Sequence, residues 1–228
     1  MRNALWTRIV VAAAACAIGA TWLHLPWLHY LAKPLATLGC LMIAWGAAPP
    51  RSARYRRGVL VALALGLGGD VLLMLPDEAL FPAGLGLFLL GHLAYLVAMT
   101  DGVRLLARIQ PAVVIGLLVT LLLATLLKAV EPALRVPVAT YMIVLGLMAA
   151  QARVRAMVLP DAGTRLAALG ATLFMVSDAL LGVERFVTPF PLANVAILAT
   201  YWGAQWALAL SVQAPAALPL TSETAAAA

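Results

Sequence analysis

Long apolar segments alternate along the chain with short stretches that contain proline, glycine or clustered charges. A membrane-spanning helix needs about 20 mostly apolar residues, and stretches of the second kind usually mark helix ends. The pattern predicts eight membrane-spanning helices, over residues 6–23, 30–48, 58–75, 81–99, 111–130, 133–150, 164–183 and 193–212. We therefore expect an all-α membrane protein in which residues 1–213 form a single bundle of eight transmembrane helices. Residues 214–228 are mostly Ala, Pro, Ser and Thr and are predicted to form a disordered C-terminal tail.

The composition agrees with a chain whose surroundings are lipid. Hydrophobic residues make up 64% of the sequence and charged residues 11%, and the mean hydropathy is +1.02. Soluble domains average about 45–50% apolar and about 25% charged residues. Cys16 and Cys40 both lie in apolar segments and have no neighbouring Cys or His pattern, which indicates packing residues rather than a disulfide or zinc site.

The cations are distributed unevenly between the two sides of the predicted bundle. The net charge is +6, and all Lys and Arg residues except Lys33, Lys128, Arg135 and Arg185 fall on the side that holds the N-terminus. Because cytoplasmic loops carry the excess of Lys and Arg, both termini are predicted to be cytoplasmic. We expect a multi-pass integral protein of a bacterial inner (plasma) membrane, and no nucleic-acid partner, because basic and aromatic residues are not interleaved.

Two acidic residues lie inside predicted spans, in the same local pattern. Asp70 lies in Gly69-Asp70-Val71-Leu72-Leu73, and Asp178 lies in Ser177-Asp178-Ala179-Leu180-Leu181. A charge within the bilayer is costly, so such a residue is expected to face the bundle interior and to be functional. Both Asp residues are predicted at similar depth, each on the third helix of a four-helix half. The repeat favours two parallel four-helix halves related by an axis along the membrane normal.

Further polar residues follow helical spacing on other predicted spans. Residues three, four or seven positions apart share one face of a helix, and this spacing predicts one polar cavity in the outer half of the bundle. Plainer roles remain open: His92 can be an interhelical hydrogen-bonding residue, the tyrosines can be packing residues, and Lys33 can extend its ammonium to the interface. His92 is the only His within a predicted span, so we expect neither a metal nor a cofactor. The candidates besides the two Asp are Lys33, His92, Tyr95, Tyr141, Tyr201 and Gln205.

Two carboxylates at similar depth can divide the roles of acid and base. If they lie close together, repulsion and desolvation favour one protonated and one ionised group. The protonated group can then donate to a reacting atom while the other activates water. This chemistry suits acid-triggered hydrolysis of ether-like bonds, and it suits proton coupling in a transporter equally well. A structural or lipid-sensing protein is a third class.

The order of the polar motifs resembles the YhhN family of eight-span membrane proteins, which includes the mammalian lysoplasmalogenases. The resemblance covers about residues 6–212, and Trp202 after Tyr201 is a small departure from it. The motifs that carry it are Lys33-Pro34, Gly69-Asp70-x-Leu-Leu, Phe88-x-x-x-His92-x-x-Tyr95, Ser177-Asp178-x-Leu-Leu with Arg185-Phe186, and Tyr201-x-x-x-Gln205.

The resemblance implies hydrolysis of the vinyl-ether bond of lysoplasmalogens, which releases a fatty aldehyde and a glycerophospho-base. On this reading a lysophospholipid is the substrate, and the bilayer is the surrounding medium. Asp70 and Asp178 are the expected acid and base, and Lys33 is expected to meet the substrate phosphate. The alternative is a proton-coupled transporter of a small molecule or lipid. The residues expected to line the substrate cavity are His92, Tyr95, Tyr141, Tyr201 and Gln205.

Overall fold

A computed structural model describes residues 2–215, and within that range the chain forms eight α-helices, one 3₁₀ helix and no β-strand. The expected disordered tail therefore lies outside the described residues, apart from residues 214 and 215. The helices are α1 (Arg2–Trp22), α2 (Pro26–Trp45), α3 (Ala53–Met74), α4 (Phe81–Met99), α5 (Gln110–Ala129), α6 (Pro132–Val158), α7 (Ala162–Phe186) and α8 (Ala193–Leu210), with the 3₁₀ helix η1 at Glu78–Leu80.

The helix ends follow local sequence signals. Proline stands in the first turn of α2, α4, α5 and α6, where its missing N–H is not needed by the helix. Ser52 accepts a hydrogen bond from the Tyr55 backbone N–H at the start of α3. Asp161 and Thr164 form a capping box at the start of α7, which satisfies two backbone N–H groups that would otherwise lack partners.

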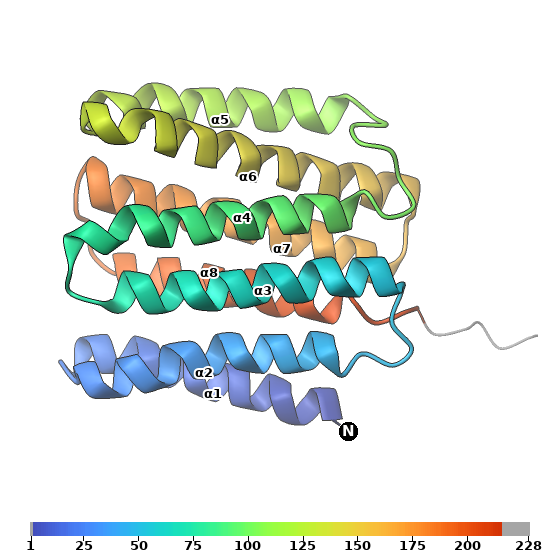
Figure 1. Ribbon diagram of the computed structural model, residues 1–228, viewed down its shortest axis with the longest axis horizontal. Helices are drawn as coiled ribbons and strands as arrows, with labels where there is room; N and C mark the ends of the chain where they lie inside the picture. Colours follow the sequence, from blue (N-terminus) through green and yellow to red (C-terminus); the bar gives the residue numbers. More distant parts are fainter. Residues whose placement is uncertain (1, 216–228) are drawn as a thin grey trace, which may run out of the picture.

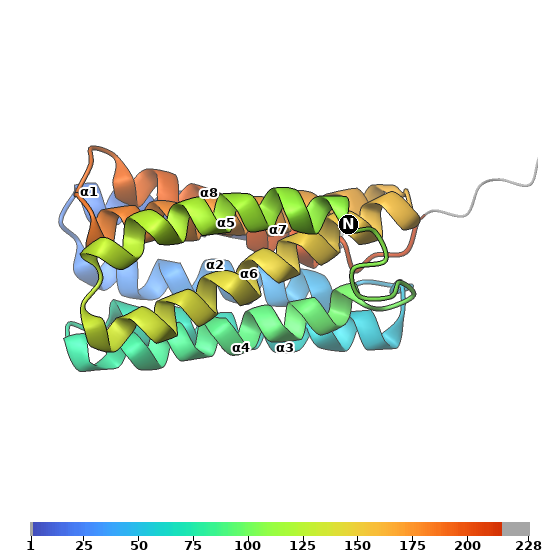
Figure 2. The same cartoon turned by 90° about the horizontal axis from the view of Figure 1, so that it is seen from above.

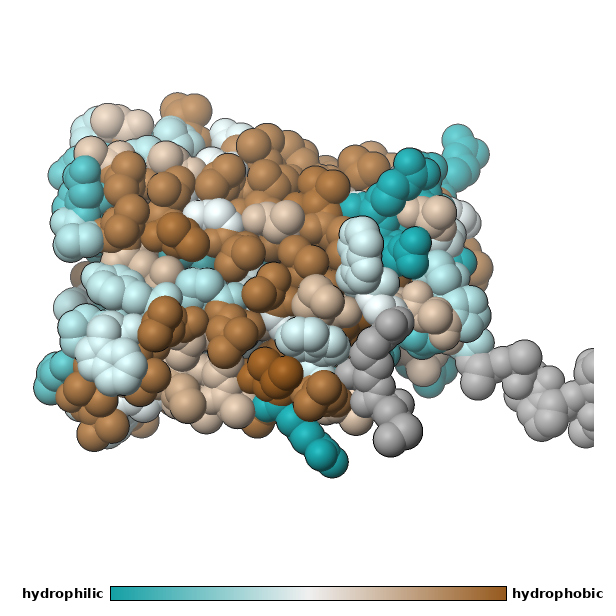
Figure 3. All heavy atoms as spheres, turned by 60° about the horizontal axis from the view of Figure 1, so that its bottom comes forward, coloured by the Kyte–Doolittle hydropathy of each residue, from teal (hydrophilic) through white to brown (hydrophobic). Residues whose placement is uncertain are grey.

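The fold confirms an all-helical chain, while the eight-span count stays a prediction. Six helices, α1 and α3 to α7, are long and apolar enough to cross a membrane, as a multi-pass membrane protein requires. α2 and α8, of 20 and 18 residues, are not among these six, and each contains polar residues within its length, Lys33 in α2 and Gln205 in α8. Figure 1 shows the helices of the bundle with their axes nearly aligned. Figure 3 shows apolar side chains across most of the middle of one face, with polar groups toward its ends.

Neighbouring helices in the sequence pack as antiparallel pairs: α1 with α2, α3 with α4, α5 with α6, and α7 with α8. Close approach depends on glycine, because a Cβ at Gly58 would lie 2.8 Å from the Ala98 Cβ and one at Gly170 would lie 2.9 Å from the Ala204 carbonyl oxygen. Small residues are a common device for such packing in membranes. Contacts of α8 with α1 and α2, of α4 with α6, of α2 with α3 and of α6 with α7 connect the pairs into one bundle. The expected layout of two halves stays a prediction.

One end of the bundle is closed by ion pairs; we call it the arginine-rich end. It contains the start of α1, the end of α8 and the loops between α2 and α3, α4 and α5, and α6 and α7 (Figure 1). Arg51 forms an ion pair with Asp161, and Arg155 lies 3.7 Å from an Asp101 oxygen. The Arg155 guanidinium also lies 4.2 Å from the centre of the Tyr55 ring, and the Arg155 side chain is buried.

The predicted span over residues 133–150 lies within a longer helix, since α6 continues beyond residue 150 to Val158. Arg153 and Arg155, placed in a loop by the apolar pattern, lie on this helix. A helix of 27 residues is about 40 Å long and extends beyond the hydrocarbon core of about 30 Å. Hydropathy reports the part of a helix that lies in hydrocarbon, and therefore misses its extension into the interface.

Candidate functional site

The bundle contains a central cavity of about 750 Å³ that extends from the interior to the end opposite the arginine-rich end. Its walls are largely aliphatic and aromatic and include Leu73, Phe88 and Leu198. The cavity lies in the half of the bundle away from the N-terminus; that this half is the outer one stays a prediction. The predicted site residues that line it are Lys33, Asp70, Tyr141, Asp178 and Tyr201. The others, His92, Tyr95 and Gln205, are buried behind this lining.

Asp70, on α3, is surrounded by groups that favour its ionised form. Oδ2 accepts hydrogen bonds from the hydroxyls of Thr37 and Tyr201, each at 2.7 Å. The Lys33 ammonium lies 3.5 Å from Oδ1, and the two side chains are only 12% and 2% exposed. No Lys or Arg lies near Asp70 in the sequence. Its cationic partner, Lys33, comes from another helix, α2. A carboxylate with two donors and an ammonium has its charge compensated.

Asp178, on α7, has a different set of partners. The Tyr141 hydroxyl donates to its Oδ2 at 2.5 Å, and Nε2 of His92 lies 2.9 Å from the Tyr141 oxygen and 3.4 Å from Oδ2. Because the tyrosine proton goes to Asp178, Nε2 acts as the donor to Tyr141. Among residues 2–215, Nδ1 of His92 is buried without a hydrogen-bond partner, which disfavours a proton there. The geometry therefore favours a neutral His92 protonated at Nε2.

A chain of hydrogen bonds supports the Asp70 side of the cavity from behind. The Tyr95 hydroxyl donates to the Gln205 carbonyl oxygen at 2.6 Å, and the Gln205 amide donates to the Tyr201 oxygen at 3.0 Å. Tyr201 in turn donates to Asp70. Tyr95 and Gln205 therefore position Tyr201, and neither contacts the cavity itself.

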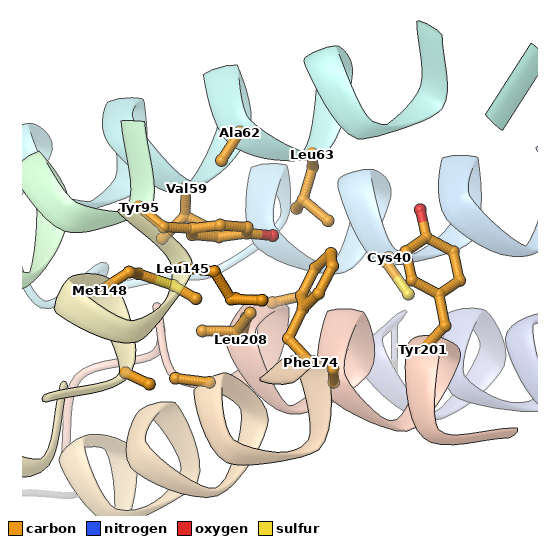
Figure 4. Close-up of a cluster of buried hydrophobic side chains, with 14 of the residues drawn as sticks. Cys40, Val59, Ala62, Leu63, Tyr95, Leu145, Met148, Phe174, Tyr201 and Leu208 are labelled. Carbon is orange, nitrogen blue, oxygen red and sulfur yellow. The ribbon is translucent and has the colours of Figure 1, made fainter. Parts of the chain in front are cut away.

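The buried ring of Phe174 lies between the two Asp clusters. Its centre is 4.6 Å from that of His92 and 5.4 Å from that of Tyr201, both in edge-to-face contact. Figure 4 shows the Phe174 ring between Tyr95 and Tyr201 in the bundle interior. In the described part of the chain no hydrogen bond connects the two carboxyl groups, so Asp70 and Asp178 share a cavity but have separate partners.

The cavity mouth carries charged residues that the sequence motifs did not identify as substrate contacts. Arg185 lines it, pairs with Glu78 and lies with its guanidinium 4.5 Å from the centre of the Phe81 ring. Its side chain is 37% exposed. The signal that could have found it is its position at the end of α7, two turns beyond Asp178. Glu184 also lines the mouth and accepts a hydrogen bond from the Phe190 backbone N–H at 3.0 Å.

Within residues 2–215 no group of three or more His, Cys, Asp or Glu side chains is placed to hold a metal ion. The chemistry that the described residues can supply at the cavity is proton donation and acceptance by the two carboxyl groups, with hydroxyl and ammonium groups that stabilise their charges.

Comparison with known proteins gives matches over most of the chain. A family model described as the YhhN family matches residues 28–212. Lysoplasmalogenase TMEM86B from Rattus norvegicus is 33% identical over 81% of this chain and 73% of its own length. The human protein of the same name is 30% identical, over 87% and 82%, and a lysoplasmalogenase from Mycobacterium tuberculosis is 31% identical, over 76% and 66%. No solved structure matches the chain significantly.

Proposed function

This chain belongs to the YhhN family, and we propose that it is a membrane-embedded hydrolase that cleaves the vinyl-ether bond of a lysoplasmalogen or a related lysolipid. The products are a fatty aldehyde and a glycerophospho-base. The observation that carries the proposal is the pair of carboxyl groups, Asp70 and Asp178, on the wall of one largely apolar cavity. A volume of about 750 Å³ lies within the range of about 300–1,000 Å³ that ligand sites usually have. The names of the relatives support the same activity.

Asp178 is the proton donor in this proposal. It has no cationic partner when His92 is neutral, and its Oδ2 already accepts the Tyr141 proton. In an apolar cavity the uncharged acid costs less than an unpaired carboxylate. Its Oδ1 has no hydrogen-bond partner among the described residues and is the oxygen that carries the transferable proton. Once the proton has left, the hydroxyl of Tyr141 and the Nε2–H of His92 stabilise the new carboxylate.

Asp70 is the ionised partner. Lys33, Thr37 and Tyr201 hold its negative charge at the cavity wall, where it stabilises a cation and accepts a proton from water. Lys33 is retained by Asp70, so the expectation that it meets the substrate phosphate stays a prediction. We place the phosphate at Arg185 in the cavity mouth, where phosphate oxygens would replace the exposed Glu78 carboxylate on a guanidinium that is 37% exposed.

The reaction follows from the chemistry of the vinyl ether. The Asp178 proton adds to the β-carbon of the double bond, and the remaining cation is shared between the α-carbon and the ether oxygen. Water adds to the α-carbon and gives its proton to Asp70, which leaves a hemiacetal. The hemiacetal C–O bond to glycerol then breaks: protonated Asp70 gives its proton to the glycerol oxygen, and the Asp178 carboxylate takes the proton of the hemiacetal hydroxyl, whose oxygen becomes the aldehyde carbonyl. This return of a proton to Asp178 completes the cycle.

Aldehyde release from matched lipids tests the function. We expect the purified protein to release fatty aldehyde from an alkenyl lysophospholipid and not from its saturated alkyl analogue. Asp178→Asn and Asp70→Asn should each lower turnover by roughly 10²- to 10⁴-fold, the usual contribution of acid–base groups. Asp77→Asn is the matched control, because Asp77 is an exposed cap of η1 outside the cavity lining.

The isotope content of the product tests the mechanism separately. In D₂O, protonation at the β-carbon places one deuterium at C2 of the aldehyde, which is trapped at once by reduction and measured by mass spectrometry. Release of aldehyde without this deuterium would overturn the acid step. Substrate-dependent proton flux in sealed vesicles with no product would favour the transporter instead, and full turnover in both Asp→Asn variants would overturn the paired roles.

A further inference from the structure

A second cavity, of about 630 Å³, lies at the arginine-rich end between α5, α6 and α7. It shares no lining residue with the central cavity. Figure 1 shows α5 at one edge of the bundle, and in the perpendicular view of Figure 2 α5 lies in front of α7 and α8. We call this space the α5–α7 groove. Its lining consists of Gln110, Pro111, Val114, Ile115, Leu118, Arg153, Ala156, Met157, Arg165, Ala168, Leu169, Thr172 and Met175.

The groove faces the lipid side of the bundle. Val114 is 58% exposed, Leu118 51% and Leu169 51%, so its apolar walls are open at the surface that a bilayer would cover. This surface would therefore contact acyl chains.

Two guanidinium groups lie at the polar end of the groove, and no acidic residue lines it. Neither Arg153 nor Arg165 has an acidic partner within 4 Å among the described residues. Arg153 donates instead to the Thr172 hydroxyl at 3.0 Å. Arg51 and Arg155, at the same end of the bundle, are both paired with Asp. The two groove arginines thus lack the carboxylates that neutralise their neighbours.

Their depth corresponds to the headgroup region. Arg153 lies in the last turns of α6 and Arg165 in the first turn of α7. Met175 lies ten residues further along α7, about 15 Å deeper, which is half of the hydrocarbon core. A single acyl chain can extend along this distance while a phosphate stays beside the arginines.

We propose that the α5–α7 groove binds an anionic phospholipid, with its phosphate between Arg153 and Arg165 and one acyl chain against α5 and α7. Guanidinium and phosphate form paired, charge-assisted hydrogen bonds, and basic residues near a membrane surface favour the binding of anionic lipids. A zwitterionic headgroup would bring an ammonium toward two cations with no carboxylate to receive it. The preference is therefore for a lipid with net negative charge.

Native mass spectrometry of the purified full chain tests the preference. The protein is titrated with phosphatidylglycerol and with phosphatidylcholine of the same acyl chains. We expect phosphatidylglycerol to bind roughly tenfold more tightly, as two contacts of this kind allow. The Arg153→Gln/Arg165→Gln variant should lose this preference.

Two further variants distinguish lipid binding in the groove from a general effect of surface charge on lipid binding. Arg54→Gln/Arg57→Gln removes the same charge from exposed positions at the same end and should keep the preference. Ala156→Phe leaves the charge unchanged but narrows the groove, and should weaken phosphatidylglycerol binding. No preference in the unaltered protein, or an equal loss in both double variants, would overturn the proposal.

Discussion

Asp70 and Asp178 occupy the same sequence motif but different surroundings. Each follows a small residue and precedes x-Leu-Leu in the second half of a long helix. Asp70 has an ammonium and two hydroxyl donors around it, and its side chain is 2% exposed. Asp178 has one hydroxyl donor and a neutral imidazole, and its side chain is 10% exposed. The local sequence therefore brings an acid to the cavity, and distant helices determine its charge.

The difference explains how two similar acids can take different roles. In a medium of low polarity a carboxylate persists only where a cation and donors compensate it. α2 supplies both Lys33 and Thr37 to Asp70 from one helix face, whereas α4 and α6 supply only neutral groups to Asp178. The proposed division into an ionised group and a proton donor follows from this asymmetry.

Removal of the cation should have the largest effect on stability. Lys33→Met leaves the Asp70 carboxylate buried without its ammonium, and breaking a buried pair from one side costs about 3–5 kcal/mol. The Lys33→Met/Asp70→Asn double variant removes both charges and should recover most of this loss, while remaining inactive. Thermal unfolding in detergent measures both effects.

Asp178→Asn supplies the contrast, because this residue has no cation to leave unpaired. Asp178→Asn should lower the free energy of unfolding by much less than Asp70→Asn, which leaves the Lys33 ammonium buried without its carboxylate. Equal destabilisation by the two Asp→Asn changes would contradict the difference in charge state.

Removal of one hydroxyl from each cluster should separate the two roles kinetically. Tyr141→Phe removes the hydroxyl that lies between His92 and Asp178, and the new carboxylate loses its only hydroxyl donor. A hydrogen bond to a charged group is worth about 1.5–3 kcal/mol, so turnover should fall roughly 10- to 100-fold. Tyr201→Phe leaves Thr37 and Lys33 on Asp70 and should cost less than tenfold. The rate of aldehyde release by each variant is measured at equal amounts of folded protein. A larger loss of turnover in Tyr201→Phe than in Tyr141→Phe would contradict the assignment of Asp178 as the proton donor.

The sequence was sufficient to predict the helices because hydropathy reports which segments avoid water. All eight predicted segments overlap helices of the structure. Their ends were less accurate: α2 begins at Pro26, ahead of residue 30, where a proline in the first turn marks the start. The short helix η1 was not predicted, because three residues carry no periodic pattern.

The site could be predicted as a set of residues but not as a set of pairs. An acid or a lysine inside an apolar segment must face the interior, and this argument found Asp70, Asp178 and Lys33. Which helix lies beside which depends on the tertiary packing, so the Lys33–Asp70 and Tyr141–Asp178 contacts had no signal in the sequence. The sequence also could not give the distance between the two carboxyl groups. The prediction of one protonated and one ionised Asp assumed that Asp70 and Asp178 lie close together, but among the described residues no hydrogen bond joins them.

Substitution of Asp161, which pairs with Arg51 at the arginine-rich end, should have the smallest effect on stability. It gives a reference against which the effects at Asp70 and Asp178 can be compared. Burial raises the pKa of Asp161, but hydrogen bonds from Arg51 and from the backbone N–H groups of Thr164 and Gly163 outweigh it, so the pKa lies below its ordinary value. A lowered pKa stabilises the fold above about pH 4, the ordinary value for Asp, and this contribution is lost as the pH falls through the pKa of the folded state. Asp161→Asn keeps the helix cap and loses the charge; because the pair is partly exposed, we expect a cost of about 0.5–1 kcal/mol and unchanged aldehyde release. Thermal unfolding at neutral and at acidic pH measures this loss. The difference in stability between the variant and the unaltered protein should shrink toward zero at acidic pH. A difference in stability that does not change with pH would mean that Asp161 contributes through the helix cap and not through its charge.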